Sequence, residues 1–360
     1  MIFGGPYRGR RLNNVSQAAV PSLAPAVLAG ERLALARLLS QIENDAPLGM
    51  LALGELFPHT GKAHLVGVTG APGTGKSSLV NQLALYFRRP PDGESPRRVA
   101  ILAVDPSSPF TGGAILGDRV RMRDLSGDPG VFIRSMAARG SLGGLAPATA
   151  SLAQVFDAAG FELILIETVG AGQAEVDIAR LAHTTIVVEA PGLGDDIQAI
   201  KAGILEIADI LVVNKADRPG ADNTERSLRN MLQLAHPAPR QFQHHGRLEK
   251  VAAPAAVLVP EPIWETPVLR SVATEGAGVA ELAAAIARHR LHLEQTGDWG
   301  RRERFRLQAE LEARLRQGLL ERWRESASPT LYDEILDRLV ARRISPVQAV
   351  TALIDGGSSQ

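Results

Sequence analysis

Short runs of apolar residues recur along the middle of the chain and alternate with segments of helical character. The runs predict buried strands at 65–68, 99–104, 131–135, 163–167, 185–189, 210–214 and 268–272. Most of the runs are nearly continuously apolar, which is typical of strands buried on both faces of a parallel sheet. We therefore predict an α/β fold, in which a doubly wound, mostly parallel sheet is flanked by helices.

Helical patterns lie on both sides of this region. Apolar positions at helical spacing over 31–42 and an apolar stretch over 48–57 indicate that 1–60 is an N-terminal helical extension. Residues 61–295 would form the central domain and 296–360 a charged helical arm. One apolar stripe of the arm repeats every fourth residue: Leu307, Leu311, Leu315, Leu319 and Trp323. Two interpretations stay open, an arm that covers the central domain and an arm that joins two copies.

The alternation of strands and helices fails between residues 235 and 262. This stretch holds five prolines and no clear period, so we interpret it as a long surface insertion. Its His244-His245 pair could bind a metal ion, but the chain has no Cys and this stretch has no acidic cluster. A solvated loop is the interpretation that we favour.

The first predicted strand leads directly into a complete phosphate-binding loop. The expected nucleotide-binding residues of this loop are Gly70, Ala71, Pro72, Gly73, Thr74, Gly75, Lys76, Ser77 and Ser78. The glycines allow backbone N–H groups to converge on phosphate oxygens at the N-terminus of the following helix. Lys76 would bring a cation to the β- and γ-phosphates, and the Ser77 hydroxyl is the expected Mg²⁺ ligand.

A second motif, at the end of another strand, indicates which base is bound. Asn214, Lys215 and Asp217 form an N-K-x-D arrangement, in which the carboxylate can accept from both N1–H and the exocyclic amine of guanine. Adenine presents no such pair of donors. Further along, Ser271, Val272 and Ala273 match a loop whose backbone N–H contacts the guanine oxygen, although Ser271 could instead cap a helix.

Acidic residues follow two further strands. Glu167, with Gly170 shortly after it, fits a carboxylate on the Mg²⁺ side and an N–H that meets the γ-phosphate. Asp105 ends another strand and could reach the metal ion through water. Asp118 is a third candidate carboxylate, for which an exposed capping residue is an equal alternative.

Composition narrows the possibilities for partners and compartment. The 39 basic and 39 acidic residues balance, so charge gives no reason to expect nucleic acid or membrane as a partner. The absence of Cys excludes disulfides and thiolate metal sites. No apolar run reaches the ~18 residues that span a bilayer, and the arginines near the N-terminus are interpreted as part of an ordinary extension. We expect a cytoplasmic protein.

The ordered motif set at 70–77, 104–108, 112–118, 167–173, 194–201 and 214–217 resembles the ArgK/MeaB subfamily of SIMIBI-class GTPases. The resemblance implies that Asp105, Asp118 and Glu167 surround Mg²⁺ and the attacking water. It also implies switch segments at 105–125, 167–180 and 191–204, in the last of which Gln198 and Lys201 would move toward the nucleotide. The chain departs from the subfamily at Ser141, where His is expected, and at Arg119-Val120, where Lys-Thr is common.

This resemblance implies a P-loop NTPase that binds GTP or GDP with Mg²⁺ and catalyses hydrolysis with Lys76, Asp105, Asp118, Glu167, Gln198 and Lys201. The implied partner is a cobalamin-dependent acyl-CoA mutase. The GTPase would gate delivery of the cofactor to this mutase, or protect or reactivate it. A homodimer is also expected. The alternatives are a metal-insertion GTPase for a nickel or zinc enzyme, a small-molecule or protein kinase, and a nucleotide-bound partner without hydrolysis. The absence of Cys argues against the first, and Asp217 against an ATP-using kinase.

Overall fold

A computed structural model describes residues 22–91, 93–106, 123–125, 127–138, 147–168, 174–192, 206–234, 263–326 and 328–357. Packing divides the chain into two compact units. The first comprises Ser22–Leu307, and the second comprises Met1–Pro21 together with Gln308–Gln360. We describe each unit by itself.

A seven-stranded sheet with the order β3-β2-β4-β1-β5-β6-β7 forms the centre of the first unit. All of its neighbouring strands are parallel. Its strands are β1 (His64–Thr69), β2 (Val99–Pro106), β3 (Val131–Ala138), β4 (Leu163–Thr168), β5 (Thr184–Glu189), β6 (Ile210–Asn214) and β7 (Val268–Ser271). The predicted strands and the doubly wound fold are thereby confirmed, with β7 ending one residue earlier than expected.

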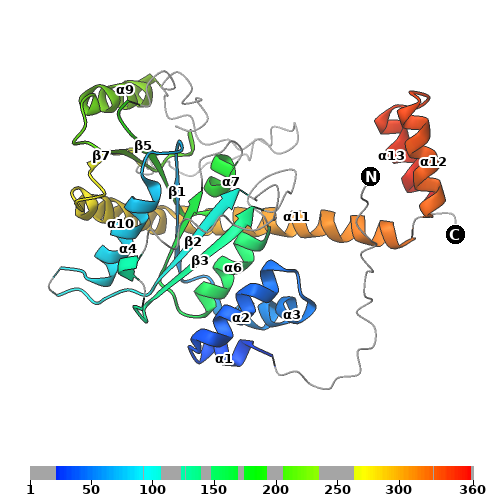
Figure 1. Cartoon of the computed structure of the whole chain (residues 1–360), viewed down its shortest axis with the longest axis horizontal. Helices are drawn as coiled ribbons and strands as arrows, with labels where there is room; N and C mark the ends of the chain where they lie inside the picture. Colours follow the sequence, from blue (N-terminus) through cyan, green and yellow to red (C-terminus); the bar gives the residue numbers. More distant parts are fainter. Residues whose placement is uncertain are drawn as a thin grey trace, which may run out of the picture. The chain divides into compact units, whose positions relative to one another are not determined.

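Helices cover both faces of this sheet (Figure 1). α4 (Lys76–Arg88) and α10 (Val279–Thr296) share a core cluster on one face. α6 (Pro147–Ala158), α7 (Ala174–Leu181) and α9 (Ala221–Leu234) lie on the other. At Gly67 of β1 an added Cβ would lie 2.5 Å from Cγ1 of Ile178. The glycine therefore lets α7 approach the central strand closely.

Three short helices precede the sheet and share a core cluster with α6. They are α1 (Ala24–Leu28), α2 (Arg32–Glu43) and α3 (Pro47–Leu56), followed by the 3₁₀ turn η1 (Phe57–His59). α2 buries Leu35, Leu38, Leu39 and Ile42 along one stripe, which is the helical spacing seen in the sequence. A second 3₁₀ turn, η2 (Arg123–Leu125), precedes β3.

The second unit contains the end of α11 (Asp298–Ser326), α12 (Pro329–Val340) and α13 (Pro346–Gly357). Trp323 donates a hydrogen bond from Nε1 to Leu353 O at 3.0 Å, which ties α11 to α13. α13 begins at Pro346, directly after Ser345. Ser345 and Gln348 exchange side chain to backbone hydrogen bonds at 3.3 and 2.9 Å, as in a capping box.

Across the described part of the chain, no helix combines the length and apolar character needed to cross a membrane.

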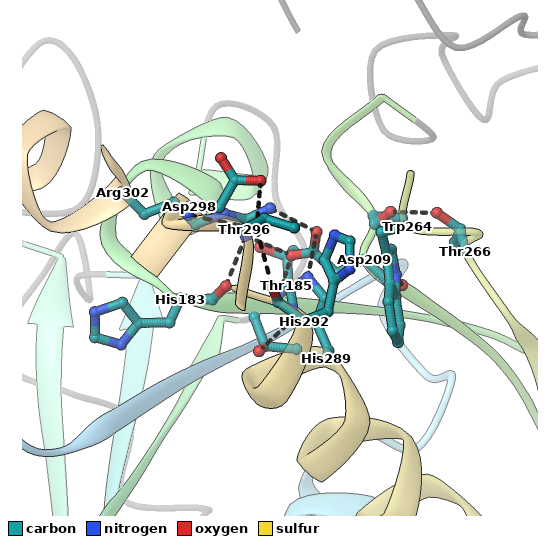
Figure 2. Close-up of polar contacts among 12 residues, drawn as sticks. His183, Thr185, Asp209, Trp264, Thr266, His289, His292, Thr296, Asp298 and Arg302 are labelled. Atoms are coloured by element: carbon teal, nitrogen blue, oxygen red, sulfur yellow. Dashed lines mark hydrogen bonds and ion pairs between the residues drawn. The ribbon is translucent and has the colours of Figure 1, made fainter. Parts of the chain in front are cut away.

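A buried polar cluster lies at the amino ends of the central strands (Figure 2). We define this amino-end cluster as His183, Asp209, His289 and Arg302. Arg302 donates two hydrogen bonds of 2.9 Å to the carboxylate of Asp209 and one of 2.6 Å to the carbonyl of His183. His289 Nε2 lies 3.3 Å from Asp209 Oδ1, and the Thr185 N–H donates to Asp209 at 2.8 Å. Burial disfavours the charged carboxylate, but the charges of Arg302 and His289 outweigh it and hold the pKa of Asp209 well below its usual value.

Candidate nucleotide-binding site

The turn between β1 and α4 is shaped by glycines whose conformations other residues rarely adopt. Gly70 has a φ of 135°, and an added Cβ would lie 2.1 Å from the carbonyl oxygen of Val188. Gly75 has a φ of 92°, and an added Cβ would lie 2.4 Å from Nδ2 of Asn214. These two positions admit only glycine without a shift of the backbone. α4 then begins at Lys76, so its N-terminus faces the loop.

Lys76 is buried inside this loop. Its ammonium donates hydrogen bonds to Gly70 O at 2.8 Å and to Ala71 O at 2.9 Å. Thr74 closes the turn with a hydrogen bond from Oγ1 to Ala71 O at 3.0 Å. The loop backbone and the lysine thus form one compact unit, with the cation held against the carbonyls that the turn exposes.

Asn214, at the end of β6, joins three loops through one side chain. Its Nδ2 donates to Thr74 O at 2.8 Å, which ties this loop to the phosphate loop. Its Oδ1 accepts hydrogen bonds of 3.1 Å from Ser271 Oγ and from the Ala273 N–H. Ser271 therefore bonds to Asn214. The N-cap residue of α10 is Gly278, so Ser271 does not cap this helix. The amide is buried, so its donor and its acceptor are used together.

The residues that follow Asn214 turn toward the phosphate loop. Lys215 has a φ of 55°, and its ammonium donates to Gly73 O at 2.6 Å. The carbonyl of Ser271 accepts from the Ala216 N–H at 3.0 Å, which holds the turn against the end of β7. Asp217 is exposed, with its side chain accessible to a ligand. The Val272 N–H donates to Ala277 O at 3.0 Å in the neighbouring turn.

Ser77 and Glu167 meet beside the phosphate loop. Ser77 Oγ donates to Glu167 Oε1 at 2.6 Å, although the two residues are 90 positions apart. Glu167 is buried at the end of β4, next to Thr168, which donates to Thr69 Oγ1 at 3.0 Å. A hydroxyl and a carboxylate in contact are hard oxygen donors of the kind that Mg²⁺ prefers. The residues present therefore fit a magnesium ion.

Several predicted residues cannot be placed in this way. Gly170, Asp118, Gln198 and Lys201 lie outside the described residues, as do Ser141, Arg119-Val120 and His244-His245. Asp105 lies in β2, where its backbone is paired with Ala137 of β3. Within the described ranges, no group of three or more His, Asp or Glu side chains is arranged to hold a metal ion.

Sequence analysis missed the Thr69–Thr168 pair. The available signal was a pair of β-branched polar residues, each the last residue of an apolar strand and each next to a predicted site residue. Thr69 lies outside the motif set, and Thr168 lies inside one motif that assigns it no role. The register of β1 and β4 is what brings the two residues together.

A phosphate loop between the central strand and a helix, joined to an N-K-x-D loop, defines a P-loop NTPase of the GTPase class. Residues 35–328 match the family described as "Methylmalonyl Co-A mutase-associated GTPase MeaB". The chain belongs to this family.

Individual relatives agree with this assignment. A Pyrococcus horikoshii relative, whose name carries a provisional GTPase assignment, is 42% identical over 326 residues, covering 91% of this chain and 94% of the relative. GTPase ArgK of Escherichia coli is 35% identical over 274 residues, covering 74% of this chain and 75% of that protein. A crystal structure of an LAO/AO transport system kinase matches with a TM-score of 0.64 and 24% identity, over 92% of this chain and 95% of that one, and supports the fold. The predicted subfamily, fold class and GTPase activity are confirmed.

Proposed function

We propose that this GTPase is a Mg²⁺-dependent chaperone of a cobalamin-dependent acyl-CoA mutase of the methylmalonyl-CoA mutase type. It would gate delivery of the cobalamin cofactor, or protect and reactivate the mutase. The observation that carries the proposal is the family match over 35–328, because its description names a GTPase that is associated with this mutase. The candidate nucleotide site supports it, because Asn214 holds the phosphate loop and the proposed base loops together.

Hydrolysis would depend on positioning and on neutralisation of charge. Phosphoryl transfer to water needs little covalent chemistry from the protein. When GTP binds, we expect the Lys76 ammonium to exchange its loop carbonyls for β- and γ-phosphate oxygens, which are stronger acceptors. The predicted motif set includes no arginine in the role of an arginine finger, and such a finger contributes roughly 10³- to 10⁵-fold. We therefore expect slow hydrolysis by the isolated protein.

Ser77 and Glu167 would hold Mg²⁺ on the phosphate side of the pocket. Their oxygens are 2.6 Å apart and come from different elements, and Mg²⁺ would take both as ligands in place of the hydrogen bond between them. Asp105 and Asp118 would add carboxylates at the same end, through water. The bound ion would neutralise charge on the β- and γ-phosphates. The protein's own task is to fix these oxygens relative to the phosphate loop.

The mutase would accelerate hydrolysis by ordering residues 191–204 and bringing Gln198 and Lys201 to the nucleotide. Single-turnover GTP hydrolysis, measured with and without a methylmalonyl-CoA mutase, tests this. We expect a faster rate with the mutase and loss of the acceleration in Lys201→Ala. Lys62→Ala is the matched control, because Lys62 is exposed just before β1, at the opposite end of the strand from the phosphate loop. An accelerated rate that Lys201→Ala leaves unchanged would contradict the proposed role of this residue, and no acceleration at all would contradict the partnership.

Guanine selectivity would come from Asp217. Its carboxylate can accept from two guanine donors, and with adenine the same group would be enclosed without them. Competition of GTP and ATP against a fluorescent GDP analogue should favour GTP by about 100-fold or more. Asp217→Ala should remove most of this preference, whereas Asp222→Ala, an exposed carboxylate at the start of α9, should keep it. Equal competition by ATP and GTP would refute guanine recognition.

The second unit would join two copies of the chain. Leu311, Leu315 and Leu319 recur on α11 with exposed fractions of 67%, 56% and 56%. Burying such a stripe against its counterpart in a second copy would remove apolar surface from water. Light scattering should show a dimer for the native chain and a monomer for Leu315→Asp. Gln317→Asp, exposed on the same helix, should remain dimeric. A monomeric native chain would refute this arrangement.

A further inference from the structure

Two threonines end the neighbouring strands β1 and β4. Thr168 Oγ1 donates a hydrogen bond to Thr69 Oγ1 at 3.0 Å, and neither residue has accessible surface. The strands around them are otherwise largely apolar, so valine would fill the same space. A buried hydroxyl is costly unless it is paired, and these two satisfy each other. Packing alone therefore does not explain why hydroxyls occupy both positions.

The pair lies on the face of the sheet opposite Glu167. Successive side chains of a strand point to opposite faces. Glu167 points to the α4 face, where it accepts from Ser77, so Thr168 points to the face that α7 covers. Thr69 shares that face with Gly67, which packs against Ile178 of α7. The hydroxyl bond thus holds the β4 backbone from one face while Glu167 reaches the site from the other.

The bond also lies one residue beyond the last paired position of these two strands. The register of β1 and β4 runs from His64 with Leu163 to Val68 with Glu167. After Thr69 the chain enters the phosphate loop at Gly70. Each threonine is also paired with a further strand, Thr69 with Val187 and Thr168 with Val104. The Thr69–Thr168 bond therefore adds a direct side-chain link between the strand that enters the loop with Ser77 and the strand that carries Glu167.

We propose that Thr69 and Thr168 are positioning residues, which hold Glu167 against Ser77 and thereby set how tightly the nucleotide site takes Mg²⁺. This inference rests on the proposed magnesium site. It assigns no contact of either threonine with nucleotide or metal. Loss of this bond should change the dependence of nucleotide binding on Mg²⁺. The affinity for nucleotide in the absence of Mg²⁺ should stay unchanged.

Dissociation of a fluorescent GDP analogue, measured over a Mg²⁺ titration and in EDTA, tests the proposal on the full chain. Thr168→Val, Thr69→Val and the double variant should each need roughly three- to tenfold more Mg²⁺ to slow dissociation, the change expected when one buried hydrogen bond is lost. Their affinity for the analogue in EDTA should stay within about twofold of the native value. Thr168→Ser keeps the hydroxyl and should restore the native Mg²⁺ dependence.

Thr149→Val is the matched control. Thr149 of α6 is also fully buried, and its hydroxyl donates to Met136 Sδ at 3.4 Å. Met136 lies in β3, which is three strands from β1 in the sheet. Thermal melts report whether each variant folds, and Thr69→Val tests the pair if Thr168→Val does not fold. A Mg²⁺ dependence no more shifted than that of Thr149→Val, or no rescue by Thr168→Ser, would overturn the positioning role with the magnesium site intact. A native chain that binds GDP without any response to Mg²⁺ would overturn both.

Discussion

Replacement of Arg302 by methionine should strongly destabilise the first unit. Arg302 is the main charged partner of Asp209 in the amino-end cluster, through two hydrogen bonds of 2.9 Å (Figure 2). The carboxylate side chain is 1% exposed, and that of Arg302 is 24% exposed. Methionine keeps most of the length and apolar contact of the side chain but removes the charge. The substitution therefore leaves a buried carboxylate without its strongest counter-charge.

The expected cost follows from what Asp209 retains. Removing one member of a buried ion pair costs about 3–5 kcal/mol. Asp209 would keep the Thr185 N–H and the nearby His289, so the lower end, about 3 kcal/mol, applies. With a urea m-value of roughly 3 kcal/mol/M for a unit of this size, the midpoint of unfolding should fall by about 1 M.

Tryptophan fluorescence during urea unfolding measures this directly. Trp264 donates to Asp209 O at 2.8 Å, and Trp299 stacks on His183 with 3.9 Å between ring centroids. Both probes therefore report on the cluster. Arg304→Met is the matched control, because Arg304 is exposed on the same helix. A midpoint shift below about 0.3 M, or one no larger than that of the control, would refute the reasoning.

Acid gives a second check on the same pair. A carboxyl with a depressed folded pKa adds stability above its unfolded pKa of about 3.9, and this stability is lost as the pH falls. Without Arg302, burial opposes ionisation of the Asp209 carboxyl. Protonation of this carboxyl therefore raises the stability of the variant relative to that of the native chain. The difference in free energy of unfolding should shrink as the pH is lowered from 7 toward 4. A difference that stays constant would show that Arg302 acts through packing alone.

Three further outcomes are expected. Gly67→Ala should lower the melting temperature in calorimetry, because the new Cβ would lie 2.5 Å from Cγ1 of Ile178 and α7 must shift; an unchanged melt would contradict this packing. Burial raises the pKa of Glu303, but hydrogen bonds with His183 and an arginine lower it to about 2, so the native chain should lose stability from about pH 4.5 down to 2, and Glu303→Gln should flatten this part of a pH–melting curve. Asn214→Ala removes three hydrogen bonds among nucleotide-site loops and should weaken binding of a fluorescent GDP analogue at least tenfold; an unchanged affinity would show that the loops hold themselves.

The sheet and the phosphate loop could be predicted because their signals are local. Strands buried on both faces give continuous apolar runs, so each strand of the sheet is visible without knowledge of its neighbours. The glycines at 70 and 75 are required by the conformation of one turn, and the lysine follows directly. These residues are neighbours in the sequence as well as in space, so their spacing alone predicts the loop.

The amino-end cluster could not be predicted, because its members are distant in sequence and each has an ordinary environment when considered alone. Asp209 and Arg302 are 93 positions apart, and Arg302 lies in a helix full of arginines. Nothing in the sequence distinguishes Arg302, which is mostly buried, from Arg304, which is exposed. The difference arises from packing: the first turns of α11 pass the amino ends of β5 and β6, where the carbonyl of His183 and the carboxylate of Asp209 accept from one guanidinium group.

The hydrogen-bond partners around position 214 explain why asparagine suits it. The position needs one donor toward the carbonyl of Thr74 and one acceptor toward the Ser271 hydroxyl and the Ala273 N–H, within a buried space. Aspartate would place a carboxylate against a carbonyl, and leucine would leave all three partners without a bond. One neutral amide satisfies them, and in doing so it makes the phosphate loop and the two base-side loops a single mechanical unit. Displacement of any one loop breaks a hydrogen bond of the amide that holds the other two. If these loops bind phosphate and base as proposed, the two kinds of recognition would therefore be coupled through this side chain.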